Sequence, residues 1–154
     1  MINSRQQAYL EAMDIGVWRL RKTPSTCAPD LDTGIGLKLG PGSGGILLIC
    51  AADTHSASRL ANDIARALGS VPVWAWPDSD TNAIKLKEAV EENLFTTVAI
   101  FGDDLARQCN GSELPVSVGP AKLVVLPAME DIQRQAAARR ALWTVFCHNG
   151  MVKN

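Results

Sequence analysis

The sequence predicts an α/β fold, namely a three-layer α/β/α sandwich around a small, mainly parallel sheet of about four strands. Hydrophobic residues make up 47% of the 154 residues, enough to bury one domain-sized core. From residue 46 onward, short apolar runs alternate with segments of helical periodicity. This alternation is typical of a parallel sheet covered by helices, and right-handed crossovers place those helices on both faces.

Each expected strand is a short apolar run, and each expected helix has apolar residues at three- and four-residue spacing. The strands are expected at residues 46–51, 71–76, 97–101 and 122–126. The helices are expected at residues 56–68, 83–92, 104–109 and 131–148. The last helix has a wide apolar arc and is expected to close the core, with Arg139 and Arg140 either at a solvated edge or in a polar rim.

Two regions precede the α/β domain, which is expected to span residues 46–154. Residues 1–22 form a mildly basic amphipathic segment that begins with a Ser4–Gln7 capping box. Residues 23–45 are rich in Pro, Gly, Ser and Thr, as linkers are. We therefore expect a flexible N-terminal segment. Its Trp18 either folds back onto its own domain or anchors the segment in a partner's groove.

Composition argues against several classes of protein. A net charge of -1 and a pI near 6.1 give no basic footprint for direct nucleic-acid binding. The longest apolar stretch falls far short of the roughly 20 residues that cross a membrane, and no signal peptide is recognised. The four cysteines form no C-x-x-C pair, so we expect reduced thiols in the cytoplasm, with no metal site and no cofactor.

Acidic residues follow three of the expected strands, where parallel sheets bind ligands. If Asp53, Asp78 and Asp103 hold Mg²⁺, the chain is a small phosphate-handling enzyme or nucleotide-binding domain. The favoured alternative is that these junctions supply helix N-caps, from Asp53 or Thr54, Asp80 or Thr81, and Asp103. The glycine run at 40–45 lacks the lysine of a phosphate-binding loop and precedes a strand, which disfavours nucleotide binding.

Other reactive or aromatic side chains are expected to be structural. Cys147 and His148 are neighbours, but on a helix they point about 100° apart, so Cys147 is expected to be a core cysteine rather than a nucleophile. Trp74 and Trp76 share one face of a strand and are expected to pack between sheet and helix rather than stack on bases.

Two motifs at opposite ends of the chain resemble the psi subunit family of bacterial DNA polymerase III. One is L-E-A-M-D-I-G-V-W-R-L-R-K at residues 10–22, and the other is P-A-M-E-D-I-x7-R-A-L-W-x3-C at residues 127–147. The family's last helix often begins with Asn-Pro. Because Gln135 and Ala136 stand there in this chain, that helix is expected to begin earlier.

The resemblance implies a non-catalytic adaptor in DNA replication, within an assembly that carries out nucleotidyl transfer. In the family, the N-terminal segment binds the clamp-loader collar (gamma/tau subunits), and the folded domain binds the chi subunit, which holds single-stranded-DNA-binding protein. The implied clamp-loader contacts are Leu10, Met13, Ile15, Trp18, Arg19, Leu20 and Arg21. The C-terminal motif, expected to be structural, contributes Pro127, Asp131, Arg140, Leu142 and Trp143.

Overall fold

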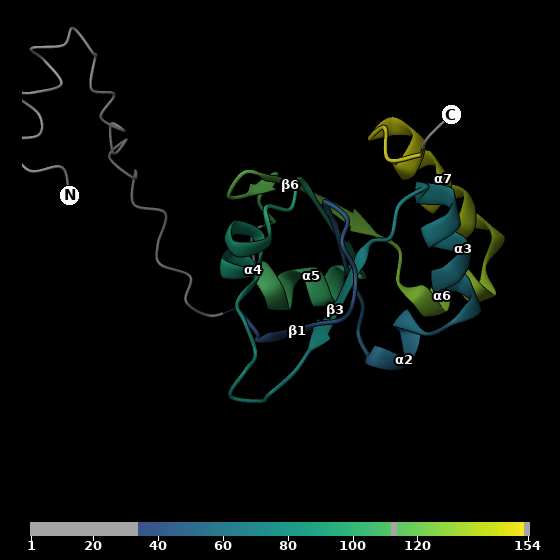
Figure 1. The fold of residues 1–154 in the computed structure, drawn as a ribbon. Helices are drawn as coiled ribbons and strands as arrows, with labels where there is room; N and C mark the ends of the chain where they lie inside the picture. The colour runs from purple at the N-terminus through teal and green to yellow at the C-terminus, as the bar shows by residue number, and fades with distance from the viewer. Residues whose placement is uncertain (1–33, 112–113, 153–154) are drawn as a thin grey trace, which may run out of the picture. The chain divides into compact units, whose positions relative to one another are not determined.

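A computed structural model describes residues 34–111 and 114–152, and these residues build one mixed sheet flanked by helices (Figure 1). The strands are β1 (Leu37–Leu39), β2 (Ile46–Ile49), β3 (Val73–Pro77), β4 (Thr97–Phe101), β5 (Ser117–Val118) and β6 (Ala121–Leu126). The helices are α2 (Asp53–Ser56), α3 (Arg59–Leu68), α4 (Leu86–Asn93), α5 (Asp103–Asn110), α6 (Met129–Arg134) and α7 (Ala136–His148).

The sheet has six strands in the order β1-β3-β2-β4-β6-β5. All four predicted strands are present as β3, β2, β4 and β6, and they pair in parallel. Each edge carries one further strand, β1 against β3 and β5 against β6, both antiparallel. The α/β class is therefore confirmed, whereas the predicted count of about four strands is wrong and the sheet is mixed.

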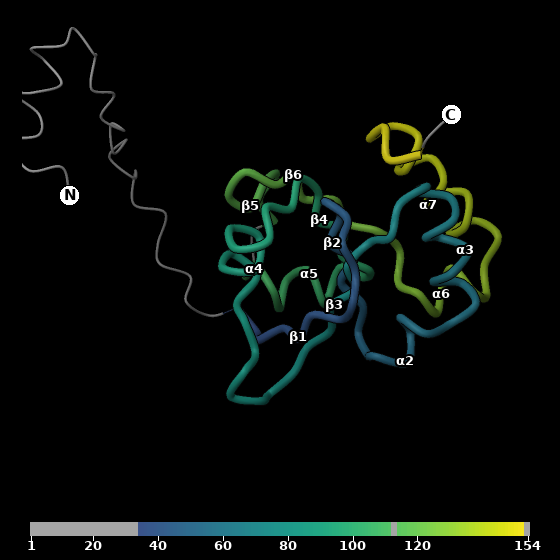
Figure 2. The backbone as a smooth tube through the Cα atoms, viewed as in Figure 1, coloured from purple at the N-terminus to yellow at the C-terminus, as the bar shows by residue number. Residues whose placement is uncertain are grey.

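The two faces of the sheet build two separate cores, as the two-residue period of a strand requires. Along β2, Leu47 and Ile49 pack on one face with side chains of α4 and α5. Leu48 packs on the other face with side chains of α3, α6 and α7. Figure 2 shows α4 and α5 on one side of the sheet and α3, α6 and α7 on the opposite side. No helix in the described ranges is long and apolar enough to cross a membrane.

The strand β1 lies inside residues 23–45, the range predicted to be a linker. At the residues of β1 the linker prediction is wrong. Leu37 is fully buried, and its backbone exchanges two hydrogen bonds with Ile84, of 2.8 and 2.9 Å. The following glycine run packs against the start of β3. A Cβ added at Gly42 would lie 2.6 Å from the carbonyl oxygen of Pro72, so only glycine permits this approach. The glycine-rich composition thus reflects close packing here.

The predicted helices are present, but two of them are interrupted. The segment predicted as helix 56–68 holds the end of the one-turn helix α2 and then α3, separated by extended backbone at Ser58 (ψ 157°). The segment predicted as 131–148 is divided between α6 and α7 by extended backbone at Gln135 (φ -117°, ψ 125°). The last helix therefore begins at Ala136, so the expectation that it begins earlier is wrong. Ala136 occupies the first helical position, which also suits proline.

Candidate functional site

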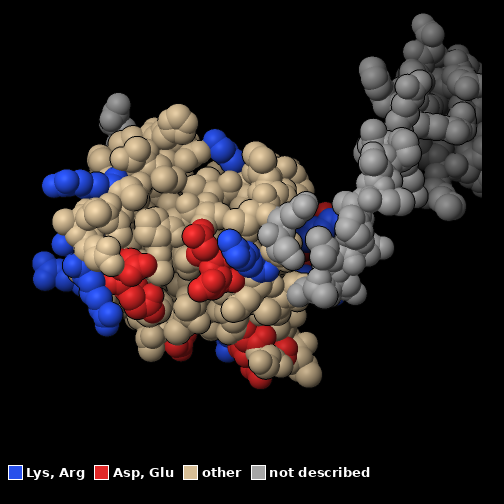
Figure 3. Space-filling view, turned by 180° about the vertical axis from the view of Figure 1, so that it is seen from behind, with Lys and Arg blue, Asp and Glu red and all other residues tan. Residues whose placement is uncertain are grey.

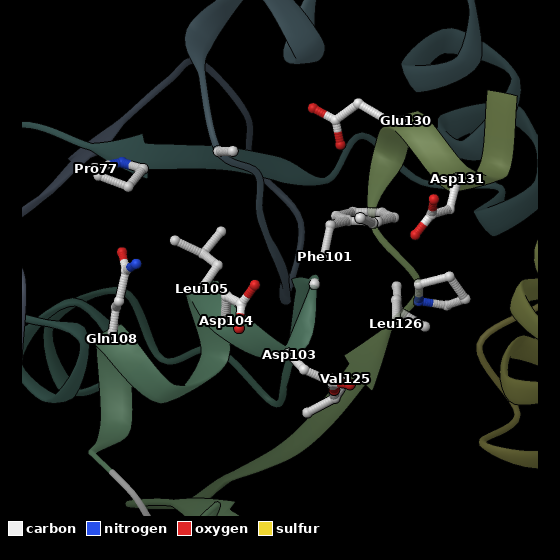
Figure 4. A pocket seen from close by; sticks show the side chains of 14 residues that line it. Pro77, Phe101, Asp103, Asp104, Leu105, Gln108, Val125, Leu126, Glu130 and Asp131 are labelled. Atoms are coloured by element: carbon white, nitrogen blue, oxygen red, sulfur yellow. The ribbon is translucent and has the colours of Figure 1, made fainter. Parts of the chain in front are cut away.

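A hollow of about 870 Å³ opens at the carboxyl ends of the parallel strands (Figure 4). It lies at the end of β4, with Ala51 just beyond β2 on one side and Leu126 of β6 on the other. The chain moves from β2 to β3 in one direction and from β4 to β6 in the other, so β2 and β4 flank the topological switch point. Ligands of open α/β sheets bind at this place, which makes the hollow the first candidate site.

The hollow is lined by carboxylates around an apolar floor. Asp103 and Asp104 come from the first turn of α5, while Glu130 and Asp131 come from the first turn of α6 (Figure 4). The residues that line it include no Lys, Arg or His. A phosphate group would meet like charge there unless a cation accompanied it. Within the described part of the chain, no group of three or more His, Cys, Asp or Glu is placed to hold a metal ion.

The three aspartates of the less favoured Mg²⁺ hypothesis are not brought together. Asp103 lines the hollow, but Asp53 and Asp78 do not. Asp53 lies in the first turn of α2. The Oδ2 atom of Asp78 lies 3.7 Å from Nζ of Lys38, and its Oδ1 accepts a 3.2 Å hydrogen bond from the backbone N–H of Asp80. Asp78 therefore stabilises the turn after β3.

The favoured capping alternative is also wrong at these residues. The N-cap positions of α2, α4 and α5 are Ala52, Lys85 and Gly102. Asp53 and Asp103 lie one residue later, in the first turn. A carboxylate there is stabilised by the positive end of the helix dipole. The side-chain cap is instead Ser58, whose Oγ accepts a 3.1 Å hydrogen bond from the N–H of Ala61 at the start of α3.

The histidines and cysteines do not form a catalytic pair in the described structure. His55 places Nε2 3.4 Å from Oε1 of Glu130, at the rim of the hollow, and its buried Nδ1 has no hydrogen-bond partner among the described residues. Cys147 is exposed, so the prediction of a core cysteine is wrong. Cys50 and Cys109 are buried, and burial raises the pKa of each thiol to about 11, which disfavours the nucleophilic thiolate.

The strand tryptophans are packed as predicted. Trp74 is 8% exposed and stacks on Phe101 with ring centroids 5.9 Å apart and planes inclined by 14°. Trp76 is partly buried against the same core. Because most of the Trp74 ring is covered by the protein itself, it offers little face for a base to stack on.

The C-terminal motif divides between core and surface. Leu142 is buried beside Ile132 and Phe146, and Pro127 lines the hollow between β6 and α6. Asp131 and Arg140 are exposed, and Trp143 is 52% exposed. The favoured prediction was a core helix that closes the domain, and it did not anticipate the exposure of Trp143. The apolar arc of α7 is wider than the surface that the core can cover, so part of it stays exposed to solvent. The width of this arc is the feature of the sequence that indicated an exposed apolar residue.

The expected clamp-loader contacts, from Leu10 to Arg21, lie outside the described residues. A model of the family described as the DNA polymerase III psi subunit matches residues 3–148, a range that contains both end motifs. No curated protein and no solved structure matches the chain. Because the family match spans nearly all of its 154 residues, this chain belongs to the DNA polymerase III psi subunit family.

Proposed function

We propose that this chain is a non-catalytic adaptor that joins the clamp-loader collar to the chi subunit, and through chi to single-stranded-DNA-binding protein. Membership of the psi family places the chain in the DNA polymerase III complex and in DNA replication. The observation that carries the proposal is the extent of the match, because residues 3–148 include the N-terminal motif as well as the folded domain. An adaptor needs two such modules. The assembly would act in the cytoplasm.

The N-terminal module would bind the collar formed by the gamma/tau subunits. An amphipathic segment that orders on a partner gains most from a few large apolar anchors. The proposed apolar anchors are Leu10, Met13, Ile15, Trp18 and Leu20, with Arg19 and Arg21 making polar contacts beside them. Joining this segment to a domain that holds another partner raises the effective concentration of one partner near the other. The linker between them is proposed to be shorter than residues 23–45, because β1 belongs to the sheet.

The alternative function, a Mg²⁺-dependent phosphate-handling enzyme or nucleotide-binding domain, has weaker support. Its best feature is the acidic hollow at the switch point of the sheet. However, Asp53 and Asp78 lie outside the hollow, and the residues that line it offer no positive charge to a phosphate. A thermal-shift scan of the protein with Mg²⁺ and nucleotides tests this alternative. A rise in Tm that Asp103→Asn abolishes would support it over the adaptor.

Calorimetric titration of the full chain into the purified clamp-loader collar tests the adaptor proposal. Trp18→Ala should weaken binding by about 2–4 kcal/mol, or about 30- to 1000-fold, because a buried anchor is lost. Trp143→Ala is the matched control, since it removes an exposed tryptophan of the folded domain. Equal binding by Trp18→Ala and the parent chain would refute the role of Trp18. No binding by a folded parent chain would refute the collar as partner.

A further inference from the structure

The helix α7 presents two different faces. Leu142 and Phe146 are buried in the core shared with α3 and α6, and Ala138 and Val145 pack partly against it. Beside this buried face runs a strip of five exposed residues, which we name the α7 outer face: Ala136, Arg139, Arg140, Trp143 and Cys147. These residues follow helical spacing, so they form one continuous strip. An apolar residue in the middle of such a strip needs a reason.

Trp143 is the unusual member of the α7 outer face. It is 52% exposed, and the other exposed large apolar residues in the described ranges are aliphatic: Val71, Leu94, Leu114 and Val116. A tryptophan covers a large area with only two torsions to restrict, which is why it is enriched in interface hot spots. Cys147, one turn after Trp143, is small, and so is Ala136 two turns before it, so a partner's surface can approach the indole ring closely.

The α7 outer face also carries unbalanced positive charge. Arg139 and Arg140 precede Trp143 by four and three residues and so flank its ring, and α7 contains no Asp or Glu. Ion pairs among the described residues join Lys38 with Asp78 and His55 with Glu130, and neither pair includes these arginines. In Figure 3, basic side chains gather at the edge of the domain that carries α3, α6 and α7. The surface complementary to this strip is apolar at its centre and acidic at its border.

We infer that the α7 outer face is the surface through which the folded domain binds its second protein. The occupant is a different protein that presents an apolar pocket for the indole of Trp143, with carboxylates that meet Arg139 and Arg140. This inference rests on the proposed adaptor function, which requires the folded domain to hold a protein partner. The inference adds the location of that partner's contact, which is the α7 outer face.

Two other occupants fit the α7 outer face less well. A symmetric contact with a second copy would set Arg139 and Arg140 against the same arginines, which repel each other. A contact between this face and the acidic hollow of another copy would be head-to-tail and would extend into open chains. Single-stranded nucleic acid usually stacks on several aromatic rings along a basic groove, whereas this face has one ring on a chain of net charge -1.

The test uses the full chain and purified chi subunit as the probe, with affinity measured by calorimetry. Trp143→Ala should weaken binding about 30- to 1000-fold, and the double variant Arg139→Glu/Arg140→Glu should weaken it and reduce its dependence on salt. The matched controls are Val116→Ala and Arg107→Glu. Val116 is an exposed apolar residue beside β5, and Arg107 is an exposed arginine of α5 on the other side of the sheet. Both controls should bind as the parent does, and circular dichroism confirms that each variant is folded.

The outcomes separate the inference from the proposed function. If the parent binds chi and every α7 variant binds it with the same affinity, the α7 outer face is not the chi-binding surface, while the proposed adaptor function still stands. Absence of chi binding by the parent would overturn both. Two further measurements, sedimentation of the chain alone and anisotropy with a labelled single-stranded oligonucleotide, examine the other occupants. Self-association or oligonucleotide binding that Trp143→Ala abolishes would also overturn the inference.

Discussion

Neighbouring positions of α7 should respond very differently to truncation, because Phe146 is buried in the core while Trp143, one turn earlier, is exposed. Phe146 is 1% exposed and packs against the core that contains Ile132 and Leu142. Phe146→Ala removes a buried ring and leaves a cavity, which should lower the free energy of unfolding by about 3–5 kcal/mol. Trp143→Ala removes a ring that is 52% exposed, and alanine's better helix propensity offsets part of the loss. Its cost should stay near 1 kcal/mol.

Urea unfolding followed by circular dichroism at 25 °C measures this difference. With an m-value of about 1.5 kcal/mol/M, Phe146→Ala should lower the midpoint by about 2–3 M and Trp143→Ala by less than about 1 M. Phe146→Leu keeps a large apolar side chain at this position and is the control that should cost clearly less than Phe146→Ala. Equal losses for Phe146→Ala and Trp143→Ala would show that both rings are buried. The face of α7 that we describe as exposed would then be part of the core, and the reasoning would fail.

Two further predictions concern the helix cap and the thiols. Ser58→Ala should destabilise the domain by about 1 kcal/mol, because the N–H of Ala61 loses its acceptor. Ser56→Ala should cost less, because the Ser56 hydroxyl only donates a hydrogen bond to the backbone carbonyl of Asp53 at the surface. Thermal unfolding of the two variants measures this difference. The pKa values of Cys50 and Cys109 are raised from 9.0 to about 11, so their contribution to stability is complete below pH 9 and lost as pH rises toward 11. Each thiol should remove up to about 1.4 kcal/mol per pH unit in that window, and a flat stability profile between pH 9 and 11 would contradict the burial. At neutral pH, peptide mass spectrometry after brief alkylation should find Cys147 modified before either buried thiol.

The central part of the fold was predictable from local pattern. The four parallel strands are buried on both faces, so each appears as a short apolar run, and the helices between them keep a helical period. The two end motifs carried the family resemblance, which the match over residues 3–148 confirms. None of these signals depends on knowing which elements become neighbours.

The edges of the sheet and the breaks in the helices were not predictable in this way. Strand β1 has three residues and β5 has two, too few to show a two-residue period. The glycines beside β1 have the composition of a linker, and only their approach to Pro72 and Val73 reveals close packing. The helices predicted at 56–68 and 131–148 keep their apolar spacing across Ser58 and Gln135, so periodicity could not detect the breaks.

The sequence by itself determined the α/β class, the four central strands and the psi family, because apolar period and motif spacing are local properties of a chain. Only the tertiary structure decided that Asp53 and Asp78 stay out of the hollow that Asp103 lines. It also decided that Leu142 is buried while Trp143, the next residue, is largely exposed. Both outcomes depend on how helices are rotated and placed against the sheet. A wide apolar arc such as that of α7 allows several rotations, and packing against Ile132 and Met151 selects one of them.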